Sequence, residues 1–283
     1  MMPNIQSVYG LKWNPFCPDI PTEAIFVGPR LDHFGGRLEH QVREGGFALI
    51  TGDPGCGKSV ALRYLAQRLG GLRDVSVGVL THPQSGVGDF YRELSHLFGT
   101  GFSAHNRWGG FKALREKWQA HIAATLSRPV LLIDEAQQML PAVLSELRLL
   151  GSTDFDSRAL LTVVLAGDAR LTDKLASEEL LPLGSRIRCR LRLEHQSPAQ
   201  LLDTLRHALD QAGSPRLMTP DLMSTLSEHA AGNPRVLFTM AAELLSEAAR
   251  RDVKQLDEKL YLEVFAVAAN PSVKTPARSN KHR

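Results

Sequence analysis

A glycine-rich stretch, TGDPGCGKSV at residues 51–60, follows directly after the apolar run 47–50 and constrains the fold more than any other feature. The stretch matches the pattern G-x-x-x-x-G-K-S from Gly52 to Ser59. Glycines let the backbone curl so that several N–H groups point inward at an anion. A helix expected at 59–69 adds the positive end of its dipole. The pattern therefore predicts a strand, a phosphate-binding loop and a helix; a plain glycine turn is the alternative.

This loop also predicts which residues bind a nucleotide. Lys58 would reach the β- and γ-phosphates, and the Ser59 hydroxyl would bind Mg²⁺. ATP with Mg²⁺ is therefore the expected cofactor pair. The remaining residues of the expected nucleotide site are Gly52, Asp53, Pro54, Gly55, Cys56, Gly57 and Val60.

Composition narrows the class of protein. Hydrophobic residues make up 43% and charged residues 22% of the 283 residues, which is ordinary for a globular protein. We expect no membrane partner, because no apolar stretch approaches the ~20 residues of a membrane span and the N-terminus lacks a signal-peptide pattern. The net charge of +3 neither indicates nor excludes nucleic-acid binding. Cys17, Cys56 and Cys189 lie far apart, which fits a reducing cytoplasm.

Apolar runs alternate with helical periodicity up to about residue 194. The expected strands are 47–51, 75–81, 130–134 and 160–166, and the expected helices are 59–69, 87–98, 111–126 and 142–150. This alternation predicts an α/β fold with a parallel sheet covered by helices on both faces.

Beyond residue 194 the strand signals stop and three helices are expected. Ser197, Thr219 and Asn233 each precede a proline, which is the pattern of a capped helix with proline at its first position. The expected organisation is a lead segment (1–24), a nucleotide-binding core (25–194), a small all-helical lid (195–268) and a basic, disordered tail (269–283).

A second motif, PVLLIDEAQQML at 129–140, places two carboxylates after a buried strand. Ligands bind at the carboxyl edge of an open α/β sheet, so this edge would present both side chains to the nucleotide. Asp134 would then contribute to the Mg²⁺ shell, and Glu135 would polarise the attacking water. The alternative is a solvated strand end.

Taken together, the motifs resemble those of AAA+ ATPases. Besides the two stretches above, the resemblance rests on LAGDARL (165–171), GSRIRCRLRL (184–193) and GNPR (232–235). The opening YGLKWNPF (9–16) is similar to the YG-x-x-x-NPF start of ExeA-like ATPases, a group related to the TniB, TnsC and MuB transposon ATPases. The resemblance implies ATP hydrolysis to ADP and phosphate by Lys58 and Glu135.

The resemblance implies further roles for arginines. Arg235 in GNPR would be the sensor-2 arginine that contacts the γ-phosphate, with a surface arginine as the alternative. Arg186 in GSRI resembles the arginine finger that reaches a neighbouring subunit's nucleotide. Three nearby arginines are alternatives for the finger role: Arg188, Arg190 and Arg192. The whole stretch also fits the amphipathic last strand of the sheet.

Sensor 1 is where the sequence departs from this family pattern. A neutral polar side chain is expected after the strand 160–166, but the chain has Gly167 and Asp168. A carboxylate beside the γ-phosphate would be repelled unless a metal or water intervenes. The sequence therefore does not assign sensor 1 to Asp168. Slow ATP hydrolysis is a possible consequence of this departure.

The stretch 102–118 mixes aromatic and basic residues. Helical spacing predicts a buried stripe at Trp108, Phe111, Leu114 and Trp118; aromatic platforms that stack on bases are the alternative. The basic residues beside that stripe are the expected contacts with DNA phosphates, since this region faces DNA in the resembling transposon ATPases: Arg107, Lys112 and Arg115. No helix resembles a reader of the major groove, so sequence-tolerant binding is expected.

The leading hypothesis is an ATP-dependent regulator of transposition. It would assemble as a homo-oligomeric ring or filament on double-stranded DNA, with nucleotide between subunits, and recruit a transposase or integrase. The first alternative is the secretion and cell-wall role of ExeA-like ATPases. The second is an ATP-controlled protein-interaction switch that does not use DNA.

Overall fold

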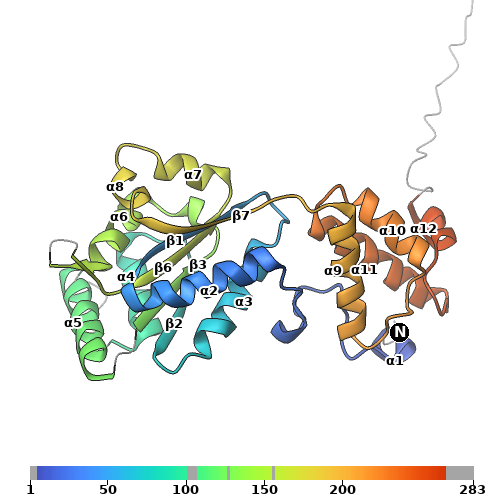
Figure 1. Cartoon of the computed structure of the whole chain (residues 1–283), viewed down its shortest axis with the longest axis horizontal. Helices are drawn as coiled ribbons and strands as arrows, with labels where there is room; N and C mark the ends of the chain where they lie inside the picture. Colours follow the sequence, from blue (N-terminus) through green and yellow to red (C-terminus); the bar gives the residue numbers. More distant parts are fainter. Residues whose placement is uncertain (1–4, 101–106, 126–127, 155–156, 266–283) are drawn as a thin grey trace, which may run out of the picture. The chain divides into compact units, whose positions relative to one another are not determined.

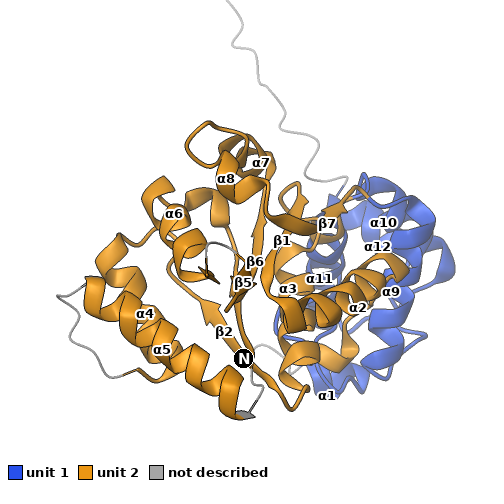
Figure 2. Cartoon of the chain, turned by 60° about the vertical axis from the view of Figure 1, so that its left-hand side comes forward, with its two compact units in different colours: residues 1–20, 196–232, 236–283 blue, residues 21–195, 233–235 orange. Residues whose placement is uncertain are grey.

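The computed structural model describes residues 5–100, 107–125, 128–154 and 157–265. These residues divide into two compact units, drawn in two colours in Figure 2. The sheet unit comprises residues 21–195 together with 233–235. The helical unit comprises the described parts of 1–20, 196–232 and 236–283. The predicted tail at 269–283 lies outside the described residues.

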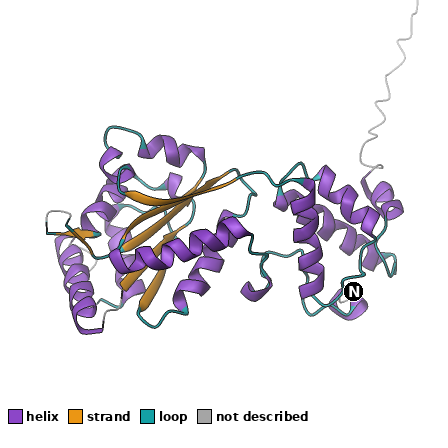
Figure 3. Cartoon of the chain, viewed as in Figure 1, coloured by secondary structure: helices purple, strands orange, loops and turns teal. Residues whose placement is uncertain are grey.

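A five-stranded sheet in the order β2-β3-β6-β1-β7 forms the middle of the sheet unit (Figures 1 and 3). Every neighbouring pair in this sheet is parallel, so the carboxyl ends of its strands meet at one edge. The predicted α/β class with a parallel sheet is confirmed. The strands are β1 (Gly46–Gly52), β2 (Val75–Leu80), β3 (Arg128–Ile133), β6 (Thr162–Gly167) and β7 (Ile187–Leu193), beside a short antiparallel pair, β4 (Ser152–Thr153) and β5 (Arg158–Ala159).

Helices cover both faces of this sheet, as the alternating pattern predicted. The α-helices of the sheet unit are α2 (Pro29–Glu44), α3 (Lys58–Gly70), α4 (Val87–Phe98), α5 (Arg107–Thr125), α6 (Pro141–Leu150), α7 (Ala169–Leu175) and α8 (Leu181–Gly184). Two short 3₁₀ helices complete it, η1 (Thr22–Ala24) and η2 (Ala136–Gln138).

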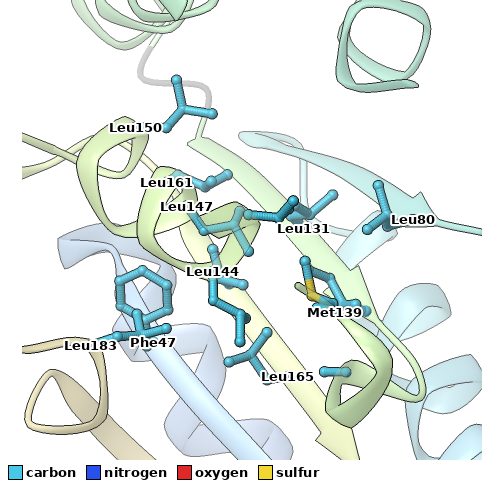
Figure 4. Packing of buried hydrophobic residues seen from close by; sticks show 14 of the residues in the cluster. Phe47, Leu80, Leu131, Met139, Leu144, Leu147, Leu150, Leu161, Leu165 and Leu183 are labelled. Carbon is cyan, nitrogen blue, oxygen red and sulfur yellow. The ribbon is translucent and has the colours of Figure 1, made fainter. Parts of the chain in front are cut away.

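Strand alternation divides the core of the sheet unit into two layers. On β1, Ala48 and Ile50 pack with α2 and α3 on one face. Phe47 and Leu49 point to the other face and pack with helices α4 to α8. Figure 4 shows this second layer, where Phe47 lies beside Leu144 of α6 and Leu183 of α8.

The helical unit contains α1 (Ile5–Tyr9), α9 (Pro198–Gln211), α10 (Pro220–His229), α12 (Glu258–Phe265) and all of α11 (Pro234–Arg250) except its first two residues. The three predicted helices correspond to α9, α10 and α11. Their starts are capped as expected: Ser197 Oγ accepts from Gln200 N, Thr219 Oγ1 accepts from Leu222 N, and Asn233 Oδ1 accepts from Arg235 N.

The N-terminal segment packs within the helical unit. Tyr9 Oη donates a hydrogen bond to the Val253 carbonyl oxygen at 2.7 Å, and Phe16 is buried with its ring centroid 6.2 Å from that of Phe238. Residues that begin the chain thus complete the core formed by its last helices. The predicted boundaries at residues 24, 194 and 268 stay predictions.

Candidate nucleotide site

The glycine-rich loop connects β1 to α3, as predicted. Gly55 and Gly57 have φ angles of 89° and 98°, which residues other than glycine rarely adopt. A Cβ atom at Gly55 would also lie 2.3 Å from Asn233 Oδ1. These positions require glycine, so the backbone itself forms the wall of the loop.

Lys58 begins α3 and is buried, with 7% of its surface exposed. Its ammonium group donates to the carbonyl oxygens of Gly52 at 2.8 Å and Asp53 at 3.2 Å. The positive charge is therefore held against the inner side of the loop, where an anion would be bound. Cys56 of the loop is buried, and Val60, in the first turn of α3, is exposed. Burial raises the pKa of the Cys56 thiol above its usual range, which keeps it protonated.

Ser59 and Asp134 come together across the sheet edge although 75 residues separate them. Ser59 Oγ donates to Asp134 Oδ2 at 2.6 Å. Hydroxyl and carboxylate oxygens are the protein ligands that Mg²⁺ prefers. The two side chains therefore fit the predicted magnesium ligands by their chemistry and by their position beside Lys58.

Glu135 follows Asp134 in a left-handed conformation with φ 50°. Its backbone N–H donates to Asp134 Oδ1 at 2.9 Å. Two amides hold its carboxylate: Gln137 Nε2 donates to Glu135 Oε2 at 2.5 Å, and Gln138 Nε2 donates to the same oxygen at 3.4 Å. Sequence reasoning did not assign either glutamine. The signal available was the amide doublet in DEAQQ, directly after the paired carboxylates.

Asp168 stands at the carboxyl end of β6 and is paired with a cation two residues later. Arg170 donates from Nη2 to Asp168 Oδ2 at 2.6 Å and from Nε to both carboxylate oxygens at 3.0 and 3.1 Å. The Arg170 guanidinium holds the pKa of the Asp168 carboxyl below its ordinary value. The repulsion anticipated from this carboxylate is thus offset by an arginine, which sequence reasoning did not identify.

Asn233 and Arg235 group with the sheet unit and lie beside the loop. Asn233 Nδ2 donates to the Pro54 carbonyl oxygen at 3.1 Å, and the Arg235 backbone N–H donates to Asn233 Oδ1 at 3.0 Å. The loop also contacts His195, whose Nε2 lies 3.2 Å from Asp53 Oδ2; His195 was not predicted. The sensor-2 role of Arg235 stays a prediction.

The arginine-rich stretch forms the edge strand β7. Ile187, Cys189 and Leu191 are buried, whereas the arginines between them are exposed, so the predicted amphipathic last strand is confirmed. Arg188 is paired with Glu44 of α2 at 2.7 Å. Arg186 precedes the strand and donates from Nη1 to the Pro182 carbonyl oxygen. Its finger role stays a prediction.

The predicted buried stripe on α5 is correct at Leu114 and Trp118 but wrong at Trp108, which is 71% exposed. Trp108 lies in the first turn of α5, beyond the hydrophobic layer, and its ring stacks on that of Phe111 with centroids 5.7 Å apart. Periodicity identified the correct helix face without showing where the neighbouring layer ends.

The three basic residues expected to contact DNA differ in their surroundings. Lys112 is exposed, and its Nζ lies 3.7 Å from Oε1 of Glu116, one helical turn later. Arg115 Nη1 donates to the carbonyl oxygens of Ser152 at 2.6 Å and Leu149 at 3.0 Å, so part of this guanidinium is bonded to the end of α6 and the start of β4. The Arg107 side chain lies outside the described residues.

Part of the chain matches a family of known proteins. Residues 41–175, just under half of the chain, match the family model described as an AAA domain. General secretion pathway protein A of Aeromonas hydrophila is 29% identical over 248 residues, which are 86% of this chain and 44% of that protein. The chain therefore spans less than half the length of this relative.

Solved structures are similar over almost the whole chain. The Aeropyrum pernix ORC2 protein, in ADPNP-ADP complexes, has a TM-score of 0.70 at 14% identity and covers 92% of this chain and 72% of that chain. Drosophila ORC bound to DNA has a TM-score of 0.67 at 19% identity and covers 95% of this chain and 66% of that chain. The chain has the AAA+ fold, as predicted. The resemblance to TniB, TnsC and MuB stays a prediction.

Proposed function

We propose that the sheet unit binds ATP with Mg²⁺ and hydrolyses it to ADP and phosphate. The observation that carries this proposal is the hydrogen bond between Ser59 and Asp134, made beside the buried ammonium of Lys58 and next to Glu135. The match of residues 41–175 to an AAA domain supports it independently.

Each residue has a defined task in this mechanism. The Lys58 ammonium exchanges its two carbonyl partners for oxygens of the β- and γ-phosphates. The backbone N–H groups of the loop donate hydrogen bonds to the phosphates. Ser59 and Asp134 would hold Mg²⁺, which when bound neutralises charge on the phosphates. Glu135 orients the attacking water and accepts its proton, and Gln137 fixes the Glu135 carboxylate.

Two arginines complete this site in the assembled protein. Arg186 of a neighbouring subunit would stabilise charge on the transferred phosphoryl group, so that ATP joins subunits of a homo-oligomer. Arg235 follows Asn233, which binds the loop, and would report the state of the γ-phosphate to α11.

The larger role that we propose is ATP-dependent, sequence-tolerant assembly on double-stranded DNA in the bacterial cytoplasm, where the oligomer recruits a transposase or integrase and so regulates transposition. The likeness to ORC bound to DNA supports the DNA part, as does the exposed Lys112. Within the part of the chain that the structure describes, no helix is both long and apolar enough to cross a membrane.

Retention of random duplex DNA tests this role. The wild-type protein should retain DNA in the presence of ATP and release it in the presence of ADP. The Glu135→Gln variant should retain DNA in the presence of ATP but should not hydrolyse the ATP. Lys112→Glu should weaken retention, whereas Lys259→Glu, an exposed lysine of the helical unit, should not. Retention should fall steeply as salt rises, since phosphate contacts release counterions. Equal retention with ATP and ADP would reject the proposed switch.

A second candidate function is a secretion-associated ATPase, which the General secretion pathway protein A relative favours. That candidate predicts nucleotide turnover that is unaffected by DNA and no nucleotide-dependent retention. An ATP-controlled protein-interaction switch predicts the same DNA results. The two are separated by the partner retained with ATP: a component of the cell wall or secretion machinery in the first, another protein in the second.

A further inference from the structure

A charged pair at the end of β6 has no role in the mechanism above. β6 lies between β1 and β3, with Gly167 opposite Thr51 and Leu165 opposite Ile133. The residue after β6, Asp168, is therefore placed between the phosphate-binding loop and the strand that leads to Glu135. Its partner Arg170 lies in the first turn of α7.

Asp168 is poorly suited to bind a phosphate itself. An ionised carboxylate only accepts hydrogen bonds, and phosphate oxygens also only accept them. Both oxygens of Asp168 are already used, Oδ1 by the backbone N–H and Nε of Arg170 and Oδ2 by its Nε and Nη2. Only 15% of the Asp168 side chain is exposed, whereas 73% of the Arg170 side chain is.

Arg170 has the donors that Asp168 lacks. A guanidinium carries five N–H donors in a rigid fork that matches phosphate oxygens. Among the described residues, Nη1 of Arg170 makes no hydrogen bond, so one side of the fork is available. Hydrogen bonds to Asp168 raise the pKa of Arg170, and the charge of Glu135 adds to this, so the guanidinium stays charged.

We propose that Arg170, held by Asp168, binds the terminal phosphate of ATP and makes the site prefer ATP to ADP. This inference rests on the proposed nucleotide function of the same edge. The guanidinium keeps Asp168 on Nε and Nη2 and offers Nη1 to the γ-phosphate, which ADP does not have. Asp168 is then a positioning residue: it orients the guanidinium and stays neutralised by it.

Equilibrium binding of ADP and of a non-hydrolysable ATP analogue, each with Mg²⁺, tests the proposal without relying on turnover. Arg170→Gln should weaken binding of the triphosphate analogue about tenfold, the effect of losing one charge-assisted hydrogen bond. It should change ADP binding by less than about twofold, within the spread of a single surface contact. The matched control is Arg92→Gln, because Arg92 is also an exposed arginine paired with an aspartate, Asp89. An equal change for both nucleotides, or none, would overturn the inference.

A second variant separates phosphate binding from folding. Arg170→Gln leaves the Asp168 carboxylate without its cation beside the phosphates. Adding Asp168→Asn removes that repulsion and keeps the cap of α7, because asparagine caps helices as well as aspartate does. The double variant should recover part of the lost triphosphate affinity; if affinity falls further instead, the pair has only a structural role. If the wild-type protein binds neither nucleotide, the proposed function itself is rejected, whereas an indifferent Arg170→Gln in a binding-competent protein rejects only this inference.

Discussion

The two units of the chain bury polar side chains in different ways. In the helical unit the buried polar side chains among the described residues are hydroxyls, Thr204 and Ser227, and each donates to a carbonyl oxygen of its own helix at 2.8 and 2.7 Å. The sheet unit buries a lysine, a glutamate and amides, including Lys58, Glu146 and Gln137. Burying a charge is costly unless it is paired or used. The buried charges of the sheet unit bond to other segments, since Lys58 donates to the loop carbonyls and Glu146 accepts from Tyr91 Oη at 2.7 Å. The buried hydroxyls of the helical unit bond to their own helices.

Removing the buried charge should break this contrast most strongly. Lys58→Ala should abolish ATP binding, because it deletes the only ammonium held against the loop carbonyls in the described structure. Isothermal titration with ATP and Mg²⁺ measures the loss. Lys259→Ala on the exposed face of α12 is the control and should bind as the wild type does. If Lys58→Ala still binds ATP normally, the loop does not bind phosphate in the way proposed.

Packing should dominate in the helical unit. Phe16→Ala should lower the free energy of unfolding by about 3–5 kcal/mol, the usual effect of truncating a buried aromatic side chain. Phe16 is 6% exposed and belongs to the cluster that α9, α10 and α11 form. Denaturant titration followed by circular dichroism measures the change, and Val8→Ala, which truncates a side chain that is 45% exposed, is the control. Equal stability of the two variants would contradict the placement of the N-terminal segment in this core.

The sequence predicted local motifs of the sheet unit but not the long-range contacts of the helical unit. The loop at 52–59 and the carboxylates at 134 and 135 were found because each motif is local and each follows a buried strand, so the sheet brings their ends together. The docking of Tyr9 onto Val253 joins residues 244 apart and has no local signal. The partners of Glu135 and Asp168 were missed for a related reason. Which amide or guanidinium reaches a carboxylate depends on side-chain rotamers that a sequence pattern does not specify.

A buried amide in the sheet unit should affect the reaction where a buried hydroxyl in the helical unit does not. Gln137→Leu keeps the volume but removes the donor to Glu135, so ATP hydrolysis should slow about tenfold while affinity for ATP is unchanged. Single-turnover rates and equilibrium binding measure the two quantities separately. Thr204→Val is the matched control, since it removes a hydroxyl that donates to Gln200 and Gln196, both in the helical unit. A fall in affinity without a change in rate would show that Gln137 maintains the loop and does not position Glu135.

The smallest effect is expected from a surface network in the helical unit. Hydrogen bonds from Arg250 and Arg251 lower the pKa of Glu247 from 4.5 to about 2. A carboxyl with a depressed pKa in the folded state stabilises the protein above its ordinary pKa, and this contribution is lost as pH falls through the folded pKa. The stability difference between the wild type and Glu247→Gln should therefore be constant above about pH 5 and shrink towards pH 2. Because exposed ion pairs contribute little, the difference should also be small.

Denaturant midpoints recorded at several pH values test this prediction, with Glu243→Gln on the exposed face of the same helix as the control. Nucleotide binding by the sheet unit should be the same for both glutamate variants at neutral pH, because neither side chain belongs to that unit. A Glu247→Gln difference that does not change between pH 5 and pH 2 would mean that packing of α11, and not the charge of Glu247, is what the substitution disturbs. That result would extend to its surface the rule already found in the core of the helical unit, where polar groups serve the helices themselves.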